Sequence, residues 1–321
     1  FTSGATESDN LAVKGVADYA ERKDKGDHII TGETEHEAVL EACEVLEERG
    51  FDVTYLPVDE NGLINPDDVE DAIRDDTILI SIMAANNEIG TIAPLKHIGQ
   101  IAKENEVFFH TDAVQAVGYL PIDVEEMGID LMSISAHKIY GPKGIGALYV
   151  RRRNPKVKLD PLIHGGGHER GWRSGTLNVP SIVGFGKAVK LADKEMEERH
   201  QHVDELTSYM WDRFDSELDD VVLNGHPEKR IPNNLNVSFL GVENKALVQN
   251  LQPEIAVSAG SACTTGKVEA SHVLQALGGD EEQWHSAVRF GLGKDNTCEE
   301  IENATDQVIQ SVSRLRKLQI S

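Results

Sequence analysis

A histidine–lysine pair, His137-Lys138, follows the apolar stretch 130–135 and leads into a turn of glycine and proline. The stretch is expected to form a short strand, so the pair would lie at the strand's end. A lysine beside an imidazole, partly shielded from water, can act as a neutral amine nucleophile. Such an amine suits a Schiff base with an aldehyde, and the commonest aldehyde cofactor is pyridoxal phosphate. Taken alone, Lys138 is better explained as a surface lysine, so the rest of the chain has to support this chemistry.

Asp112 directly follows another apolar segment, 107–110, and precedes Gln115 by three positions. A carboxylate there can keep a pyridine nitrogen protonated, which makes the ring an electron sink. Taken alone, a helix N-cap is the slightly better explanation of Asp112. Asn86 and Asn87 end a further expected strand, and their amides could bond a ring hydroxyl, although turns of this composition are common.

The segment Ser3-Gly4-Ala5-Thr6-Glu7-Ser8 is a glycine turn that is expected to open a helix. The N–H groups and the dipole at a helix start favour a phosphate, and the Thr6 hydroxyl adds a donor. A plain N-cap explains these residues about as well. His36, at the expected start of another helix, could stack on an aromatic ring or carry protons, although a lone histidine there is more often structural.

Cys263 lies in a run of small residues, 258–266, without an apolar neighbour, whereas Cys43 lies in a periodic apolar segment typical of buried cysteines. Cys263 is therefore expected to be a thiol on a mobile, solvated loop, which suits a nucleophile that must travel. Arg289, in the strand expected at 286–290, could bind a carboxylate through two hydrogen bonds. A salt bridge at the strand edge is the plainer explanation.

The sequence His164-Gly-Gly-Gly-His168-Glu169 contains residue types that bind zinc. Three consecutive glycines would hold no ligand geometry fixed, so a flexible substrate or interface loop is the better interpretation. We predict no metal site, although Cys263 could ligate a transient iron–sulfur cluster.

Strand-like and helix-like segments alternate through the first half of the chain, which predicts α/β architecture with a mainly parallel sheet covered on both faces. A long charged helix over 181–218 leads to a second α/β part. We expect two domains, residues 1–195 and 196–321. The expected strands are 28–31, 51–56, 77–82, 107–110, 131–134, 145–150, 233–239 and 286–290, and the other expected helices are 37–49, 95–104 and 298–317.

The 321 residues carry 31 Lys and Arg against 55 Asp and Glu, a net charge of −24. Such a balance argues against nucleic acid as a direct ligand. It fits a high-salt cytoplasm, and an acidic mesophilic enzyme fits comparably well. No signal peptide and no apolar run long enough to span a membrane is found, and three cysteines do not make a disulfide framework. A reducing, cytoplasmic location is therefore expected.

Taken together, the motifs resemble those of a cysteine desulfurase of the NifS/IscS type, within the class V aminotransferase superfamily of pyridoxal-phosphate fold-type I. They occur in family order across essentially the whole chain. The matching segments are 1–8, Thr34-Glu35-His36, 86–90, 111–115, 136–144, 165–176, 260–263 and 288–290. The fold implied is a large cofactor-binding domain followed by a smaller C-terminal α/β domain. Ala136 stands where many relatives carry glycine, a change expected to be tolerated.

The resemblance implies that Lys138 forms the Schiff base with pyridoxal 5'-phosphate. It also implies that Asp112 pairs with the pyridine nitrogen, and that Gln115 and Asn87 contact the ring oxygen or the substrate. His36 would stack on the ring and take part in catalysis. The phosphate would be held by Ala5, Thr6, Ser135 and His137.

On the substrate side, the resemblance implies that Arg289 holds the carboxylate of L-cysteine and that Cys263 accepts its sulfur atom as a persulfide. The long loop around Cys263 resembles the group of enzymes that pass sulfur to an iron–sulfur scaffold protein. A tRNA-thiolation protein is another possible acceptor. Thr176 would reach the phosphate of the neighbouring subunit, which implies a homodimer.

Three alternatives stay open at this point: a selenocysteine lyase, an aminotransferase, and a non-catalytic sulfur-carrier or scaffold-binding relative. Transamination needs no loop cysteine, so Cys263 argues against an aminotransferase. Family members usually carry several dozen residues before the position of Phe1 and a longer tail after Ser321. We therefore expect the family's N-terminal segment to be absent and the chain to be a fragment.

Overall fold

The computed structural model describes residues 1–259 and 270–319, which form two compact units. Unit 1 consists of Phe1–Val58, Ile64–Asn86 and Ala93–Met196. Unit 2 consists of Asp59–Leu63, Asn87–Ile92 and Glu197–Ser321. Two short segments from the first half of the chain thus belong to the second unit.

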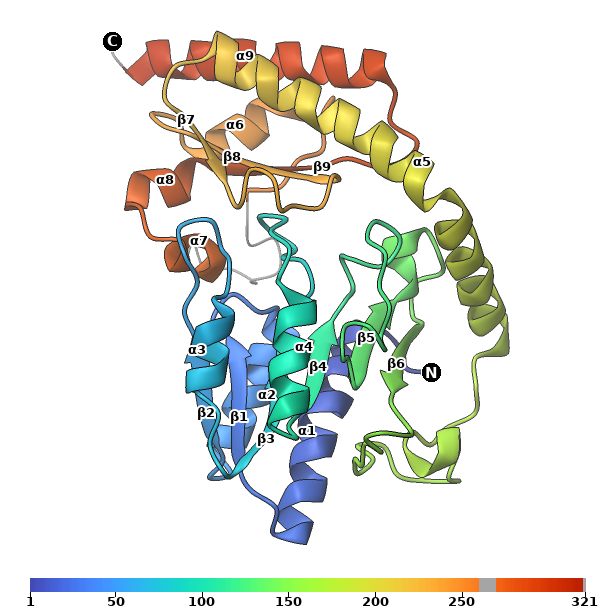
Figure 1. Ribbon diagram of the computed structural model, residues 1–321. Coiled ribbons are helices and arrows are strands. Elements are labelled where there is room, and N and C mark those ends of the chain that lie inside the picture. The colour runs from blue at the N-terminus through green and yellow to red at the C-terminus, as the bar shows by residue number, and fades with distance from the viewer. Residues whose placement is uncertain (260–269, 320–321) are drawn as a thin grey trace. The chain divides into compact units, whose positions relative to one another are not determined.

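A six-stranded sheet forms the centre of unit 1, with the strand order β2-β1-β3-β4-β5-β6 (Figure 1). The first five strands pair in parallel, and β6 pairs antiparallel with β5 at one edge. The predicted α/β fold with a mainly parallel sheet is therefore confirmed. The strands are β1 His28–Gly32, β2 Asp52–Leu56, β3 Thr77–Ser81, β4 Phe108–Asp112, β5 Leu131–Ser135 and β6 Gly146–Val150.

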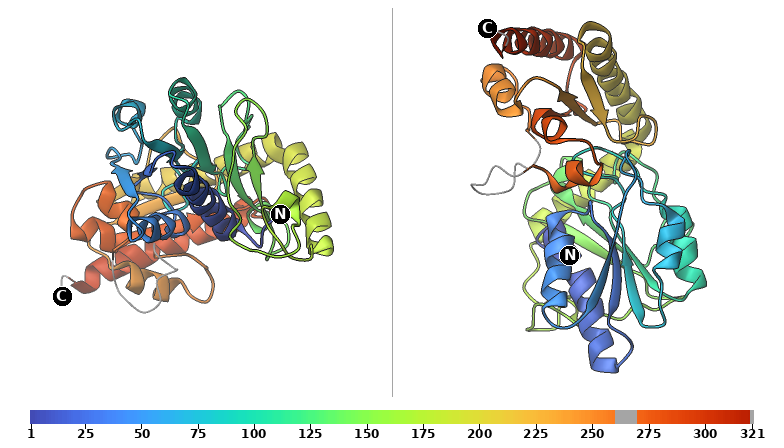
Figure 2. Two further views of the ribbon diagram at one scale, coloured as in Figure 1. Left: turned by 90° about the horizontal axis from the view of Figure 1, so that it is seen from below. Right: turned by 90° about the vertical axis from the view of Figure 1, so that its left-hand side faces the viewer.

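Helices cover both faces of this sheet (Figure 2). α1 (Ala5–Lys23) and α2 (Glu37–Glu47) pack together on one face, and α3 (Pro66–Asp71) and α4 (Leu95–Glu104) on the other. Because both faces are covered, every residue of β1 is buried, and β3 is apolar over Ile78, Leu79 and Ile80. Short one-turn 3-10 helices follow at Ala136–Ile139 and Glu169–Gly171.

Unit 2 contains a three-stranded antiparallel sheet in the order β7-β8-β9. The strands are β7 Val221–Asn224, β8 Asn234–Phe239 and β9 Ala287–Gly291. Phe214, Phe239 and Phe290 form an aromatic cluster in its core, with ring centroids 5.3 to 6.4 Å apart. The helices are α5 Val179–Glu217, which extends from unit 1 into unit 2, α6 Asn244–Leu251, α7 His272–Ala276, α8 Glu281–Ser286 and α9 Cys298–Gln319.

The segment 87–92 is bonded to the chain near the start of β8. The Ile231 N–H donates to the Gly90 carbonyl at 2.9 Å, and the Ile92 N–H donates to the Lys229 carbonyl at 2.9 Å. The Asn236 side chain donates to the Glu88 carbonyl at 3.0 Å. These three bonds explain why a segment that follows a strand of unit 1 belongs to unit 2.

Most of the predicted elements lie within a few residues of the observed ones, and helix 95–104 has the predicted bounds. β7, α3, α6, α7 and α8 were not predicted, because each is too short to show a clear periodic pattern. In the described part of the chain, the helices lack an apolar stretch of the length that crossing a membrane would require.

Candidate active site

Chemically distinctive side chains meet at the carboxyl ends of the strands of unit 1. Asp112 is the last residue of β4, and Ser135 is the last residue of β5. His36 follows β1 and caps α2. In a parallel sheet these strand ends share one edge, which is where α/β proteins bind ligands.

Asp112 is the centre of this group and is only 5% exposed. One of its oxygens accepts a hydrogen bond from the Val114 N–H at 2.9 Å, so it stabilises a turn and does not cap a helix. Burial raises the pKa of the carboxyl, and the Val114 N–H, His36 and Lys138 oppose that rise. His36 and Lys138 therefore lie close enough to Asp112 to interact with its charge.

Two further carboxyls are buried behind Asp112. Asp9, on α1, is fully buried, and the Ser133 hydroxyl is the group that favours its charged form. Glu35 is 2% exposed and accepts a hydrogen bond from the Met83 N–H at 2.6 Å. Burial raises the pKa of both well above the ordinary values, and the charge of Asp112 raises both further. Burial thus favours the neutral form of Asp9 and of Glu35.

A neutral histidine of β4 lies beside Asp9. His110 Nε2 lies 3.7 Å from Asp9 Oδ1, and burial lowers the pKa of this imidazole to about 3. Its ring nitrogens are bonded to the hydroxyls of Ser81, at 2.8 Å, and Ser133, at 3.0 Å. His110 therefore supplies no positive charge to Asp9 at neutral pH.

The His137-Lys138 pair lies in the one-turn helix Ala136–Ile139 that follows β5. Ala136 and Ile139 point into the core, so His137 and Lys138 are left on the outer side, and both are exposed. The partial shielding of Lys138 from water stays a prediction. The His137 pKa is lowered by burial and by the charges of Lys138 and Lys143.

The segment that precedes α1 lies close to Ser135 because both pair with the same residue, Gly146. Thr2 pairs with Gly146 of β6, and Gly146 pairs in turn with Ser135 of β5. A Cβ on Gly146 would lie 2.6 Å from the Ile134 carbonyl and 2.9 Å from Gly4, so only glycine allows this approach. The Ser135 hydroxyl is 2.8 Å from His137 Nδ1. The residues predicted to hold a phosphate, Ala5, Thr6, Ser135 and His137, therefore lie in one region.

His36, Gln115 and Thr176 complete the predicted residues of unit 1. His36 Nδ1 accepts a hydrogen bond from the Ala38 N–H at 3.1 Å, so the proton of the neutral ring is on Nε2. His36 and Gln115 are half-buried, and Thr176 is exposed. A structural role was the plainer explanation of His36, and the structure shows one, a cap on the start of α2.

Asn87 and Arg289 are held together within unit 2. Arg289 Nη1 donates to the Asn87 carbonyl at 2.8 Å, and the Asn234 side chain donates to the same oxygen at 3.1 Å. Arg289 also pairs through its backbone with Ser258. Asn86 behaves differently: it belongs to unit 1, is buried, and donates its amide to the Thr34 carbonyl at 2.9 Å. Of the two adjacent amides, we retain only Asn87 as a site residue.

Cys263 lies outside the described residues. Cys43 is fully buried in α2, as its apolar setting predicted, and burial raises its pKa to about 12. Of the residues considered for zinc, His168 uses Nδ1 to accept the Gly175 N–H at 3.2 Å. Over residues 1–259 and 270–319, no three His, Cys, Asp or Glu side chains are grouped as metal ligands.

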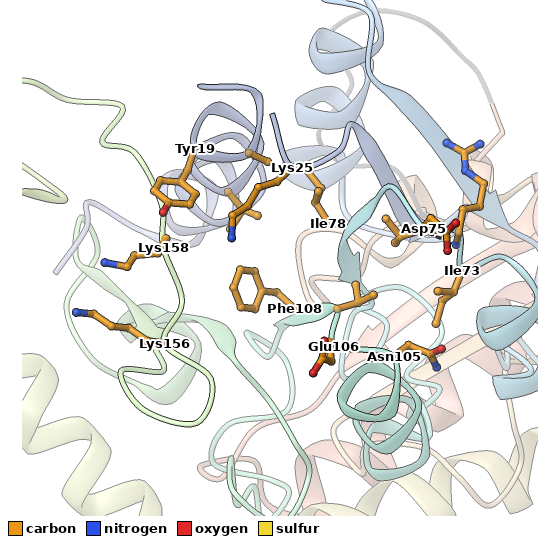
Figure 3. A pocket seen from close by; sticks show the side chains of 15 residues that line it. Tyr19, Lys25, Ile73, Asp75, Ile78, Asn105, Glu106, Phe108, Lys156 and Lys158 are labelled. Atoms are coloured by element: carbon orange, nitrogen blue, oxygen red, sulfur yellow. Dashed lines mark hydrogen bonds between the residues drawn. The ribbon is translucent and has the colours of Figure 1, made fainter. Parts of the chain in front are cut away.

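A pocket of about 620 Å³ lies at the opposite ends of the same strands (Figure 3). Residues that begin β3 and β4, Thr77 and Phe108, line it, together with Tyr19, Lys156 and Lys158. It is therefore separate from the group around Asp112.

Sequence reasoning missed two acids of α1: Asp9, whose charge interacts with that of Asp112, and Glu7, in the first turn of the helix. Glu7 stands three residues after Gly4 and accepts a hydrogen bond from the Ser3 N–H at 2.8 Å. An acid at this spacing is a recognisable helix-start signal that could have identified Glu7. The ion pair of Glu7 with Arg173, at 2.7 Å, joins residues far apart in the chain and could not have been read from local sequence.

Comparison with known proteins now defines the class of this site. The family model described as aminotransferase class-V matches residues 1–304, so the chain belongs to the class V aminotransferases. A mitosomal cysteine desulfurase of Encephalitozoon cuniculi is 51% identical over 99% of this chain and 73% of its own length. A cysteine desulfurase IscS of Aeromonas salmonicida is 51% identical over 99% of this chain and 78% of its own.

Solved structures agree with these relatives. A NifS-like protein superposes with a TM-score of 0.89 at 39% identity, covering 98% of this chain and 82% of its own. Within the class V aminotransferases, the chain therefore belongs to the cysteine desulfurases of the NifS/IscS type, a family that depends on pyridoxal phosphate and takes cysteine as its substrate.

Proposed function

We propose that the chain converts L-cysteine to L-alanine and retains the sulfur atom as a persulfide on Cys263. The observation that carries the proposal is the buried carboxylate of Asp112 with Lys138 and His36 beside it, in a chain about half identical to cysteine desulfurases. The persulfide would then pass to an iron–sulfur scaffold protein or to a tRNA-thiolation protein.

The residues around Asp112 fit pyridoxal phosphate. Burial raises the pKa of Asp112, and a cationic ring nitrogen beside it would offset that cost of burial. The phosphate of the cofactor would bind at the start of α1. This helix begins at Gly4, without a side-chain cap. A Cβ placed on Gly4 would meet no atom within 4 Å, so there is open space beside this helix start for a phosphate.

We assign the cofactor contacts accordingly. Lys138 would hold the aldehyde carbon, Asp112 the ring nitrogen and His36 the ring face, while Gln115 and Asn87 would bond the ring oxygen. When bound, the cofactor supplies an electron sink for charge that develops on the substrate. Its phosphate would be held by Ala5, Thr6, Ser135 and His137.

The substrate carboxylate would bind to Arg289. A guanidinium carries five N–H donors in a planar fork, and the bond from Nη1 to the Asn87 carbonyl fixes the plane of that fork. Lys138, as a free amine, would take the proton from the α-carbon, since its charge acts on Asp112 and it therefore lies near the site.

Sulfur transfer would follow at Cys263. The Cys263 thiolate attacks the substrate sulfur, an S–S bond forms and the bond from sulfur to the β-carbon breaks. The electron pair stays with the β-carbon, which takes up a proton. L-cysteine and one enzyme thiol thus give L-alanine and one enzyme persulfide, and no further oxidant or reductant is needed.

We further propose a homodimer in which Thr176 serves the phosphate of the neighbouring subunit. The exposure of Thr176 in the single chain supports this role, since a residue that reaches a partner must be at the surface. Residues 1–195 would carry the cofactor and 196–321 the sulfur acceptor. Cys43 and Cys298 are free thiols, which supports a reducing compartment such as the cytoplasm.

The test is release of alanine from L-cysteine by the purified protein in the presence of a thiol reductant. We expect Cys263→Ala to abolish sulfur transfer and to leave the cofactor's visible absorption intact, because the thiol acts after cofactor chemistry begins. Cys298→Ala is the matched control and should retain turnover. Full turnover by Cys263→Ala would mean that another group accepts the sulfur.

A further inference from the structure

The segment 163–175 is a closed loop whose ends are bonded together. The Ser174 N–H donates to the Ile163 carbonyl at 3.2 Å, and the Gly167 N–H donates to the Ser174 hydroxyl at 3.2 Å. Ser174 is 4% exposed, so the base of the loop is buried. The position of Arg173, next to Ser174, is therefore well fixed.

Arg173 forms a two-point ion pair with Glu7 of α1. Its Nε lies 2.7 Å from Glu7 Oε1, and its Nη2 lies 3.3 Å from Oε2. The Glu7 and Arg173 side chains are only 15% and 22% exposed. Burial raises the pKa of the Glu7 carboxyl. The hydrogen bonds from Arg173 and from Ser3 outweigh burial, so the pKa is lowered overall. Glu7 is thus an anion at neutral pH.

The position of this anion matters for phosphate binding. Glu7 is the third residue of α1 and follows Ala5 and Thr6 directly. A negative charge in the first turn of a helix stabilises the helix itself. A phosphate bound at the same turn would however meet a like charge at close range, in a region partly removed from water. A cation paired with Glu7 offsets that repulsion.

We propose that Arg173 is a positioning residue for the cofactor phosphate and acts by neutralising Glu7. This inference rests on the proposed function, since it requires that the start of α1 binds the phosphate of pyridoxal phosphate. The pair also ties the loop that leads to Thr176 to the turn that carries Ala5 and Thr6.

Binding of pyridoxal phosphate to the cofactor-free protein tests the proposal through the visible absorption of the bound cofactor. For Arg173→Met we expect affinity about tenfold lower, a loss reduced by the partial exposure of the pair. Glu7→Gln should stay within about twofold of the original chain, since it removes the repulsive charge itself. The double variant should recover to within about threefold, because no anion is left to neutralise.

Two controls separate this role from a structural one. Pyridoxal, which lacks the phosphate, should bind Arg173→Met and the original chain alike. Arg173→Lys keeps the charge and should retain most of the affinity. If circular dichroism shows that Arg173→Met is unfolded, Arg173→Gln takes its place.

A double variant no better than Arg173→Met, or an equal loss for pyridoxal, would overturn the proposal, since both would mean that Arg173 acts directly or through the fold. The proposed function fails separately, if the original chain binds no pyridoxal phosphate at all.

Discussion

Two aspartates at opposite ends of neighbouring strands in unit 1 are buried to the same extent but have different partners. Asp112 ends β4, Asp130 directly precedes β5, and each is 5% exposed. Arg151 Nε lies 2.9 Å from Asp130 Oδ1, and the Phe109 N–H donates to Oδ2 at 3.1 Å. Asp130 is thus satisfied within the protein.

Among the residues that the structure describes, the Val114 N–H is the donor bonded to Asp112, and His36 and Lys138 are near enough to act on its charge. Two more buried acids, Asp9 and Glu35, lie behind it. The difference distinguishes a carboxylate that stabilises the fold from one whose surroundings suit an added cation. The two aspartates are equally buried, so burial does not distinguish their roles. What distinguishes them is that Asp130 has a cationic partner within the protein, Arg151.

The largest effect is expected for Asp112→Asn. The variant keeps the shape of the side chain and removes the charge that would support the ring nitrogen. We expect alanine release to fall by about 10²–10³-fold, as for the loss of one electrostatic contact in an active site. The melting temperature of the cofactor-free protein should stay the same or rise, because a buried group with a raised pKa is no longer ionised.

Arg151→Met should give the reverse result. It leaves Asp130 buried without its cation, which costs about 3–5 kcal/mol of stability for a pair of this burial. Urea denaturation would measure the loss. Turnover per folded molecule should be unchanged. The opposite result would be an unchanged free energy of unfolding for Arg151→Met and a lowered one for Asp112→Asn. It would mean that Asp112 stabilises the fold and that Asp130 does not.

A smaller effect is expected from the two acids behind Asp112. Each takes up a proton on folding, because its pKa is higher in the folded than in the unfolded chain. Their contribution to stability therefore falls as the pH rises above about 4, the unfolded value, towards the raised folded values. Asp9→Asn and Glu35→Gln should each gain up to about 1.4 kcal/mol per pH unit over the original chain in this window.

Melting temperatures between pH 5 and pH 8 would show this gain as a widening difference from the original chain. Glu41→Gln, which alters an exposed carboxylate on α2, is the matched control and should show no such trend. A constant difference for Asp9→Asn would mean that Asp9 is ionised in the folded protein.

The smallest effect concerns salt. With a net charge of −24 the chain repels itself, and at 1 M salt the screening length is only about 3 Å. We expect the melting temperature to rise between low and molar salt while the cofactor stays bound, since the buried surroundings of Asp112 are screened much less. Unfolding induced by salt would contradict this and would favour an acidic protein whose carboxylates are already paired.

Much of this comparison could be predicted from the sequence, because apolar segments mark several of the parallel strands and the chemically active residues follow them. Asp112, His36 and Lys138 were each identified from such a position. The partners could not be predicted, because they come from elsewhere in the chain: Asp9 and Glu7 from α1, and Arg173 from a loop. Sequence also could not foresee that 87–92 joins unit 2, since that depends on hydrogen bonds to residues 229–236.

The most direct test of the account is to find the lysine that holds the cofactor. The protein is loaded with pyridoxal phosphate, reduced with borohydride, digested and analysed by mass spectrometry. We predict one modified peptide with the adduct on Lys138, the lysine whose charge acts on Asp112. Lys143, five residues further on in the Gly-Pro-Lys-Gly turn, is the internal control. An adduct on Lys143, or on no lysine, would contradict the account.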